Sequence, residues 1–418
     1  MPRSRPSRLR PHRSRSRARS RLTVALVLLC FVGPLSTDMY LPAFPRMTAE
    51  LRTDASGVQL TLTSFLAGMT AGHLVFGPLS DRYGRRGPLF AGTAVCAVAT
   101  ALCAVAPGLG WLVVLRFVAG FSEAAGVVIG RAVVTDVAQG ASAARLFGVL
   151  MTLSGTAPVL APLAGGAVIG AAGWRGVFWL LAGVALLVTA AVVVAVPESL
   201  PPSRRRTGSG GELLRTVREV AGDGAYAGYT LAYAFAFGTL FCYVAGSPFL
   251  LQNVLGLSVG VSSMTFAGGA VCTALAGAVS AWLVGRIAPE RLLRTGVRTV
   301  LAGTVSLLGA AVAGVLTVAG CLVSMAVVCG GLGLVLTNAT SLALARVPDA
   351  AGTGSALLGT AQSALGAVVA TLAGLGGADT AVPLFTAMTV CGAGAVGAVG
   401  AARRAGRVPA RVRVRSEG

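Results

Sequence analysis

The sequence predicts an all-α membrane protein in which twelve transmembrane helices form two bundles of six. Three observations predict this fold: the overall hydrophobicity, the number of long apolar segments and the distribution of arginine. Hydrophobic residues make up 55% of the 418 positions, charged residues make up only 11%, and the mean hydropathy is +0.79. Water-soluble globular chains of this length do not reach such values.

Twelve segments are apolar over about 20 residues, the length that an α-helix needs to cross a hydrocarbon layer of about 30 Å. We place them at residues 22–43, 58–79, 87–106, 110–134, 145–170, 173–196, 226–250, 259–284, 298–316, 318–340, 353–376 and 380–401. The first segment is too long for the apolar part of a signal peptide, so we expect it to remain as a transmembrane helix. The eight cysteines lie inside these segments without metal-binding spacing, and we expect them to be core residues.

The arginines predict the orientation of the chain in the membrane. All 34 basic residues are arginine, and 30 of the 34 lie on the cytoplasmic side if both termini are cytoplasmic. This asymmetry is what the positive-inside rule predicts for an even number of spans. We therefore expect a multi-pass protein of the bacterial inner membrane. The net charge of +20 does not indicate nucleic-acid binding, because residues 1–21 are better explained as a disordered tail that contacts anionic lipid.

A polar segment divides the chain into two halves. Residues 197–224 are rich in proline, glycine and serine and contain three consecutive arginines, as expected for a cytoplasmic linker. The linker separates an N-terminal bundle, 22–196, from a C-terminal bundle, 225–401, and a basic tail, 402–418, follows. Two parallel halves are typical of transporters whose substrate site lies near the membrane midplane between them.

The loop after the second span carries the most specific motif, GPLSDRYGRR, from Gly77 to Arg86. It matches every fixed position of the loop signature of the major facilitator superfamily, which the chain therefore resembles. Within that family the chain is similar to the twelve-span drug/proton antiporters of the bicyclomycin and chloramphenicol resistance (Bcr/CflA) group. Ordinary positive-inside charge would explain the arginines, but not an aspartate between two glycines.

The resemblance implies a structural role for this motif. Glycines would allow a tight turn and close packing, and the charged residues would bias one of two arrangements of the bundles. In the family, the last part of the motif pairs with an acid at the inner end of span 4, where Asp136 stands, and Arg85 is its expected partner. The motif residues are Gly77, Asp81, Arg82, Gly84, Arg85 and Arg86.

Further segments resemble the same group along the whole chain. Residues 36–45 are similar to its span 1 signature, 111–121 to span 4, 243–258 to span 7 and 351–367 to span 11. Residues 155–166 resemble the antiporter signature of span 5, in which prolines would bend the helix and glycines would let another helix approach. The signature residues there are Pro158, Pro162, Gly165 and Gly166. Ala119 and Ala161 depart from the usual residues of these signatures.

Three ionisable side chains are predicted to lie at membrane depth: Asp38 in span 1, and Arg116 and Glu123 in span 4. Such residues cost several kcal/mol unless they face a partner or a wet cavity, so they indicate function. Asp38 and Arg116 fall at similar depths, which makes a pair between them reasonable, and Glu123 follows Arg116 by two helical turns. We expect either carboxylate to exchange a proton while Arg116 tunes the exchange. A static cluster that only fixes packing is the alternative.

Other positions could line a drug cavity with aromatic walls and few polar groups, or could equally be ordinary side chains between helices. These are Tyr40, Phe65, Phe121, Phe237, Tyr243 and Gln252. We find no nucleotide-binding loop, metal-ligand cluster or catalytic nucleophile motif, so we expect no enzyme activity and no cofactor or metal, with the proton gradient as the energy source. We expect a monomer that exports a small amphipathic drug. A metabolite or nutrient carrier of the same fold and a non-transporting membrane sensor remain alternatives.

Overall fold

The computed structural model describes residues 12–137, 156–205, 210–284, 286–374 and 380–407, and within these ranges the regular structure is entirely helical. The N-terminal half contains α1 (His12–Asp38), α2 (Phe44–Glu50), α3 (Ala55–Tyr83), α4 (Arg86–Ala104), α5 (Leu109–Val137) and α7 (Ala157–Ala195). The C-terminal half contains α9 (Gly224–Phe249), α10 (Val259–Leu283), α11 (Pro289–Val312), α12 (Val318–Ala345), α13 (Ala351–Gly374) and α14 (Val382–Arg407). Short helical turns η1 (Leu41–Ala43) and η3 (Leu250–Val254) adjoin α2 and α9.

The described helices agree with twelve membrane crossings. Ten of them are long and apolar enough to span a membrane. One of these, α7, has 39 residues and breaks at Gly173, where φ is 69°. It therefore supplies two crossings, one on each side of the break. With the 24-residue α13 the number reaches the twelve that the sequence predicts. The part of predicted span 5 at residues 145–155 lies outside the described residues.

Local sequence signals explain where several helices begin. Asp54, Asp223, Ser258 and Thr317 each accept a hydrogen bond from a backbone N–H of the first turn that follows, which satisfies a donor that has no partner inside the helix. One boundary differs from prediction. Helix α1 begins at His12, so residues 12–21 are helical although we predicted a disordered tail. Arginine is a good helix former, and extending an existing helix costs little.

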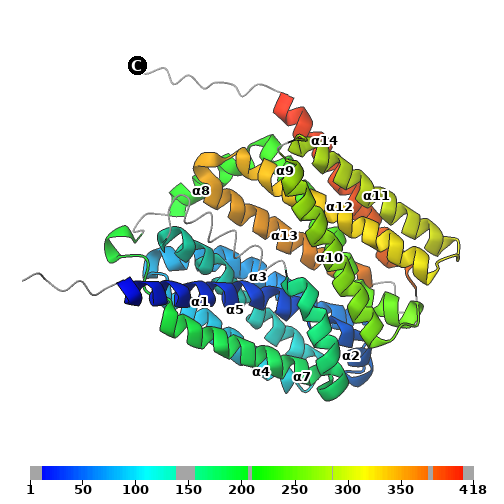
Figure 1. Ribbon diagram of the computed structural model, residues 1–418, viewed down its shortest axis with the longest axis horizontal. Helices are drawn as coiled ribbons and strands as arrows, with labels where there is room; N and C mark the ends of the chain where they lie inside the picture. The colour runs from blue at the N-terminus through cyan, green and yellow to red at the C-terminus, as the bar shows by residue number, and fades with distance from the viewer. Residues whose placement is uncertain (1–11, 138–155, 206–209, 285, 375–379, 408–418) are drawn as a thin grey trace, which may run out of the picture.

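The two halves form separate bundles that meet along two helix pairs. In the N-terminal bundle α5 packs against α3 and α4, and α7 packs against α1 and α4. In the C-terminal bundle α9 packs against α12, α13 and α14. The bundles meet where α3 contacts α13 and α7 contacts α10, and Figure 1 shows them one above the other. The segment between them contains η2 (Pro202–Arg204) and α8 (Gly210–Ala221), so part of the predicted linker is helical.

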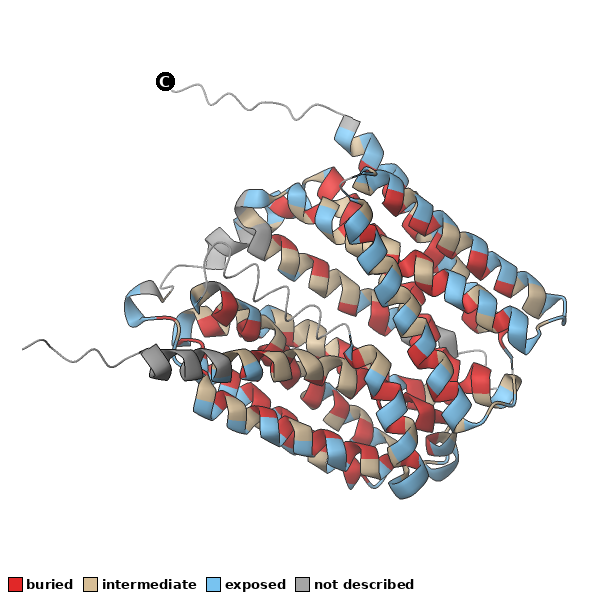
Figure 2. Cartoon of the chain, in the orientation of Figure 1, coloured by how far each residue is buried: buried red, intermediate tan, exposed pale blue. Residues whose placement is uncertain are grey.

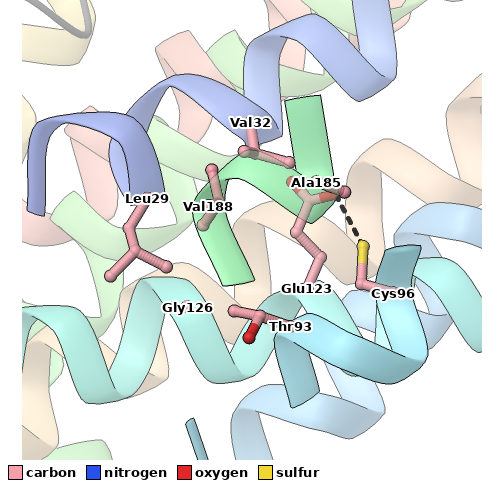
Figure 3. A pocket seen from close by; sticks show the side chains of 8 residues that line it. All are labelled: Leu29, Val32, Thr93, Cys96, Glu123, Gly126, Ala185 and Val188. Atoms are coloured by element: carbon pink, nitrogen blue, oxygen red, sulfur yellow. Dashed lines mark hydrogen bonds between the residues drawn. The ribbon is translucent and has the colours of Figure 1, made fainter. Parts of the chain in front are cut away.

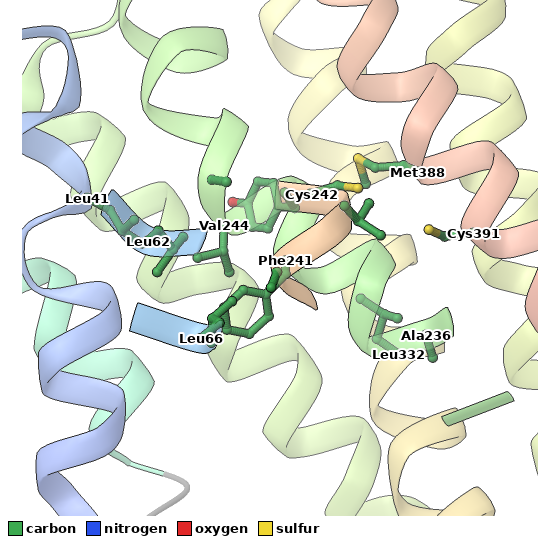
Figure 4. Close-up of a cluster of buried hydrophobic side chains, with 14 of the residues drawn as sticks. Leu41, Leu62, Leu66, Ala236, Phe241, Cys242, Val244, Leu332, Met388 and Cys391 are labelled. Carbon is green, nitrogen blue, oxygen red and sulfur yellow. The ribbon is translucent and has the colours of Figure 1, made fainter. Parts of the chain in front are cut away.

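Burial separates the faces of the helices (Figure 2). Large apolar side chains remain exposed on the outside of both bundles: Val98 of α4 is 59% exposed, Leu186 of α7 is 59% exposed and Val323 of α12 is 65% exposed. Such faces suit a lipid environment, since soluble monomers rarely expose large contiguous apolar surface. The core between the bundles is also apolar, and Figure 4 shows Leu62 and Leu66 of α3 beside Phe241 and Val244 of α9.

The eight cysteines agree with their predicted role as core residues. All eight are free thiols, and six of them are buried. No cluster of three or more histidine, cysteine or acidic side chains suited to a metal occurs within the ranges given above.

Candidate functional site

Arg116 lies inside the N-terminal bundle, on α5, and only 1% of the residue is exposed. Its Nη2 donates a hydrogen bond to the Ser36 carbonyl at 3.0 Å. The guanidinium carbon lies 4.5 Å from the ring centroid of Tyr40 and 4.1 Å from that of Phe65. Cation–π attraction to these rings offsets part of the cost of burying the charge. Among described residues, no carboxylate forms an ion pair with Arg116, and its Nε has no hydrogen-bond partner.

Asp38 does not form the predicted pair with Arg116, although both residues are described. Asp38 ends α1 and is 7% exposed, while Arg116 binds the backbone two residues earlier, at Ser36. The reason lies in the end of α1: the last four carbonyls of a helix have no partner inside it. The Ser36 carbonyl is one of these, and the guanidinium satisfies it. The similar depth of two side chains does not fix the direction in which each one points around its helix.

Glu123 lies two turns after Arg116 on α5 and is 5% exposed. The Cys96 thiol donates a long hydrogen bond to its Oε2 at 4.0 Å, and its Oε1 has no hydrogen-bond partner among described residues. Arg116 is close enough for its charge to act on Glu123, as their spacing predicts. Glu123 and Arg116 are thus a buried carboxyl group and a buried cation without a direct ion pair.

A small cavity adjoins Glu123 (Figure 3). Its volume of about 20 Å³ is enough for about one water molecule. The lining comes from α1, α4, α5 and α7 and consists of Leu29, Val32, Thr93, Cys96, Glu123, Gly126, Ala185 and Val188. The cavity therefore lies inside the N-terminal bundle and not between the bundles.

The two bundles are joined at one end of the molecule, which we call the Phe44 end and which comprises η1, α2, η3 and the start of α3. The Gln59 side chain donates to the Ala245 carbonyl of α9 at 3.1 Å, and the Gln252 side chain donates to the Pro42 carbonyl of η1 at 3.0 Å. The rings of Phe44 and Phe249 lie 6.1 Å apart, and both residues are buried. These reciprocal contacts close the Phe44 end.

The first half of α7 packs closely on both bundles, as its signature glycines predict. A Cβ atom on Gly165 would overlap the Met39 carbonyl, and one on Gly166 would lie 2.6 Å from the Ser263 Oγ of α10. Pro162 lies inside the helix. Pro158 lies in the first turn of α7, where no helical hydrogen bond is lost, so the bend predicted there is not found within the described helix. The break at Gly173 is a separate feature, since it falls where predicted span 6 begins.

Arg85 is the centre of a charge network at the opposite end, which we call the Arg85 end. Its Nε donates to Asp136 Oδ2 at 3.2 Å, which confirms the predicted pair, and its Nη1 donates to Asp81 Oδ1 at 2.6 Å. Ser80 also accepts from Nη1 at 2.7 Å. The Arg85 side chain is 11% exposed, so these contacts are less screened than those of a surface pair.

The other motif residues surround this network. The Arg82 guanidinium lies 5.5 Å from the Tyr83 ring centroid, and Arg86 Nη2 donates to the Val193 carbonyl of α7 at 2.9 Å. Gly84 has φ of 95°, a conformation that glycine adopts without strain. Gly77 faces α5 loosely, since an added Cβ would lie 3.9 Å from Val128.

Glu198 completes the network and was missed in the sequence, where it falls in the predicted linker. Its Oε1 accepts from the Arg85 backbone N–H at 2.8 Å, and its Oε2 accepts from the Arg86 N–H at 3.3 Å. Burial raises the pKa of Glu198, but the N–H donors of Arg85, Leu200 and Arg86 and the charge of Arg205 outweigh burial and leave the pKa below its ordinary value. The only sequence signal was an acid directly after an apolar span.

The six predicted cavity residues contact neighbours in different parts of the structure. Tyr40 and Phe65 surround Arg116, and the Tyr40 hydroxyl lies 3.2 Å from Thr61 Oγ1. Phe121 packs on Phe76 within the N-terminal bundle, with 5.3 Å between centroids. The remaining three lie on the C-terminal side: Phe237 in a ring stack on α9, Tyr243 against Phe266, and Gln252 at the Phe44 end. None of the six lines the cavity beside Glu123.

Comparison with known proteins agrees with this architecture. A family model described as Major Facilitator Superfamily matches residues 26–371. The chain is 36% identical over 386 residues to an uncharacterized MFS-type transporter, YdgK, of Bacillus subtilis. The alignment covers 91% of this chain and 94% of the relative. It is 29% identical to a bicyclomycin resistance protein homolog of Haemophilus influenzae, over 88% of this chain and 92% of the relative.

Two further comparisons extend the likeness. The chain is 31% identical to a chloramphenicol resistance protein of Pseudomonas aeruginosa, over 78% of this chain and 77% of the relative. Among solved structures, a bacterial homolog of the human lysosomal transporter Spinster, in an inward-facing and occupied conformation, matches with a TM-score of 0.73 at 18% identity. That match covers 93% of this chain and 97% of the other, and it bears on the fold alone.

Proposed function

Because this chain belongs to the major facilitator superfamily, we propose that it is a proton-coupled secondary transporter that exports a small amphipathic drug or antibiotic by alternating access. Relatives named for bicyclomycin and chloramphenicol resistance support drug export. The division into two bundles that meet along α3 with α13 and α7 with α10 supports a rocking motion of one bundle against the other.

One observation carries the proton coupling: Glu123 is buried with an unpartnered Oε1 beside a cavity for one water molecule. An ionised carboxylate with one oxygen unpartnered is costly at such a site, and either a proton or the charge of Arg116 would balance it. Arg116 is the available cation, since among described residues its guanidinium donates to a backbone carbonyl and not to an acid. A shift of Arg116 from Ser36 toward Glu123 would favour proton release, and its return would favour proton uptake.

Asp38 is the second candidate for the exchanging group. It is buried at the end of α1, next to the Phe44 end where the bundles close. Protonation there could be linked directly to opening of that end, because η1 begins only three residues after Asp38. The two carboxylates therefore make different predictions for a proton assay, and we test both.

The arginine distribution supports a location in the bacterial inner membrane with both termini in the cytoplasm. In that orientation the Arg85 end is cytoplasmic and the Phe44 end faces outward, so the structure corresponds to a state that is closed toward the outside. The proton gradient would supply the energy without a cofactor or metal, and we expect a monomer in contact with anionic lipid.

The test measures proton movement driven by chloramphenicol in liposomes that contain the purified full chain. We expect Asp38→Asn or Glu123→Gln to abolish the proton flux, and the variant that does so identifies the exchanging group. Glu219→Gln is the matched control, because Glu219 is exposed on α8 and its one ion pair among the described residues is with Arg215. Undiminished flux in both test variants would exclude these residues from proton coupling. Absence of flux in the wild type, with retained drug binding, would exclude coupled export of this compound.

A further inference from the structure

Three arginines line one face of α11 over its first three turns. Arg291, Arg294 and Arg298 follow one another at intervals of three and four residues, so they share one face of the helix. Arg291 and Arg298 are exposed, and Arg294 is half-buried. The arginine face is directed away from the protein, because the residues that α11 buries lie on its other side: Leu292, Leu293, Gly296, Val297, Val300, Gly303, Thr304 and Leu307.

The same face becomes apolar further along α11. Val305 and Val312 follow Arg298 by two and by four helical turns, and they are 50% and 68% exposed. Helix α11 packs on α12 and α14 at the edge of the C-terminal bundle (Figure 1). A face that is basic over three turns and apolar beyond them is suited to a lipid, because it meets first the headgroup and then the acyl chains.

Arg298 lies deeper than an arginine of a connecting turn. It precedes Val312, the last residue of α11, by 14 residues or about 21 Å, whereas the hydrocarbon layer is about 30 Å thick. The preceding turn carries the residues typical of the headgroup level: Trp282 is 64% exposed, and Arg286 lies 4.4 Å from its ring centroid. The positive-inside rule accounts for arginines in that turn. An arginine at the depth of Arg298 is stabilised when its side chain extends toward an anionic partner.

Two arginines of α14 lie at the same level. An added Cβ on Gly392 of α14 would lie 3.4 Å from Leu301 Cα of α11, so the two helices touch there. They run in opposite directions, since they are the third and the sixth long helices of the bundle. Arg403 follows Gly392 by eleven residues, close to three turns, and therefore lies on the α11 side of α14, level with the first turn of α11. Arg404 is adjacent, and both arginines are exposed.

The arginine surface, which we define as Arg291, Arg294, Arg298, Arg403 and Arg404, lacks acidic partners. None of the five forms an ion pair or a side-chain hydrogen bond with another residue in the part of the chain that the structure describes. Glu290 is the only acidic residue of α11, and α14 contains none. Five arginines and one glutamate leave four positive charges unbalanced. A phosphate group would balance this charge through charge-assisted hydrogen bonds to the guanidinium groups.

We propose that the arginine surface binds the phosphate of an anionic phospholipid. Arg294 and Arg298 of α11 and Arg403 of α14 would surround the phosphate, and the acyl chains would lie along Val305 and Val312. This lipid is a different ligand from the transported compound, because the arginine surface lies away from the helix pairs where the two bundles meet. The proposal therefore does not depend on the transport function.

The test measures lipid binding to the purified full chain by native mass spectrometry from detergent micelles. Dioleoyl phosphatidylglycerol is compared with dioleoyl phosphatidylcholine, which has the same acyl chains and no net charge. We expect the first phosphatidylglycerol to bind at least about tenfold more tightly than phosphatidylcholine. The double variant Arg294→Gln with Arg298→Gln should lose this preference, since each arginine near an anionic headgroup contributes about fivefold. Lysine at both positions should retain most of it.

Arg215→Gln with Arg218→Gln is the matched control, because both arginines are exposed on α8, outside the arginine surface. This variant removes the same charge and should keep the preference. Glycerol 3-phosphate, which has the anionic group without acyl chains, should not displace phosphatidylglycerol at equal concentration. The proposal is overturned if the wild type does not prefer phosphatidylglycerol, if the α11 variant keeps the preference, if the α8 variant loses it equally, or if glycerol 3-phosphate competes as well as the lipid.

Discussion

Replacing Gly84 by alanine should destabilise the protein through the charge network at the Arg85 end. Gly84 follows α3 with φ of 95° and ψ of 166°, a region that side-chain-bearing residues occupy at a cost of about 1–3 kcal/mol. The new Cβ would also lie 2.5 Å from Glu198 Oε2 and 2.8 Å from Arg205 Nη2. Glu198 would then have to move away from the N–H groups of Arg85 and Arg86 that it accepts from.

The expected loss follows from these two contributions. Displacing a partly exposed carboxylate from its two backbone donors should cost about 1 kcal/mol, the lower part of the range for charged hydrogen bonds. Together with the backbone strain, the free energy of unfolding should fall by about 2–4 kcal/mol. For a unit the size of one bundle this corresponds to a decrease in Tm of at least about 5 °C.

The measurement is thermal unfolding of the purified full chain in detergent, followed by circular dichroism. Gly87→Ala is the matched control: Gly87 lies in the first turn of α4, and no atom would come within 4 Å of its Cβ, so its Tm should not decrease. In a Glu198→Ala background, Gly84→Ala should cost less, because only the backbone strain and the contact with the Arg205 side chain remain. Wild-type stability of Gly84→Ala, or an equal loss in Gly87→Ala, would refute the reasoning.

Three further variants test other contacts. Because the pKa of Glu198 is lowered in the folded protein, its contribution to stability is complete above the ordinary pKa of 4.5 and is lost as the pH falls through the folded pKa. The Tm difference between the wild type and Glu198→Gln should therefore decrease below pH 4.5. A Tm difference that does not change with pH would contradict this. Gly165→Ala should destabilise by about 1–3 kcal/mol in thermal unfolding, since its Cβ would overlap the Met39 carbonyl, whereas Gly170→Ala, with no atom within 4 Å, should not. Gln252→Leu should destabilise the closed Phe44 end by about 0.5–1.5 kcal/mol. Spin labels at Arg52→Cys and Gly256→Cys, with Cys30 and Cys272 replaced, would measure the distance across this end, and we expect a larger population of the longer distance in the variant. An unchanged distance distribution would show that this hydrogen bond does not hold the end closed.

The sequence was sufficient for features that depend on composition or on local spacing. Apolar length predicted the spans, and a helical spacing of two turns predicted that Arg116 and Glu123 lie close together. A motif of fixed pattern predicted the pair between Arg85 and Asp136, which the structure confirms at 3.2 Å. In each case, the contact depends on residues near in sequence or on a family pattern that already contains the distant partner.

Contacts that depend on how helices are rotated could not be predicted in the same way. Arg116 and Asp38 have similar depths, but Arg116 is directed toward the Ser36 carbonyl. Gln59 donates a hydrogen bond to a backbone carbonyl 186 residues away. Because every residue has a backbone carbonyl, the sequence does not indicate which one a side chain contacts. Glu198 lies in a segment whose composition indicates a linker, so its role as an acceptor for the backbone N–H at the start of α4 is evident only in the structure.

If Glu123 exchanges the proton as proposed, its separation from the boundary between the bundles would require a mechanical connection, and the end of α1 can provide it. Three carbonyls of this segment contact different parts of the molecule: Ser36 accepts from Arg116, Met39 lies against Gly165 of α7, and Pro42 accepts from Gln252 of the opposite bundle. Pro34 interrupts the hydrogen bonding of α1 just before them, which makes a bend at this point less costly than elsewhere in the helix. If Arg116 leaves Ser36 when Glu123 loses its proton, the carbonyl end of α1 loses a charged partner only six residues before the contact that closes the Phe44 end. Proton exchange inside one bundle would then weaken the contact between the two bundles without the proton or the substrate sharing a cavity.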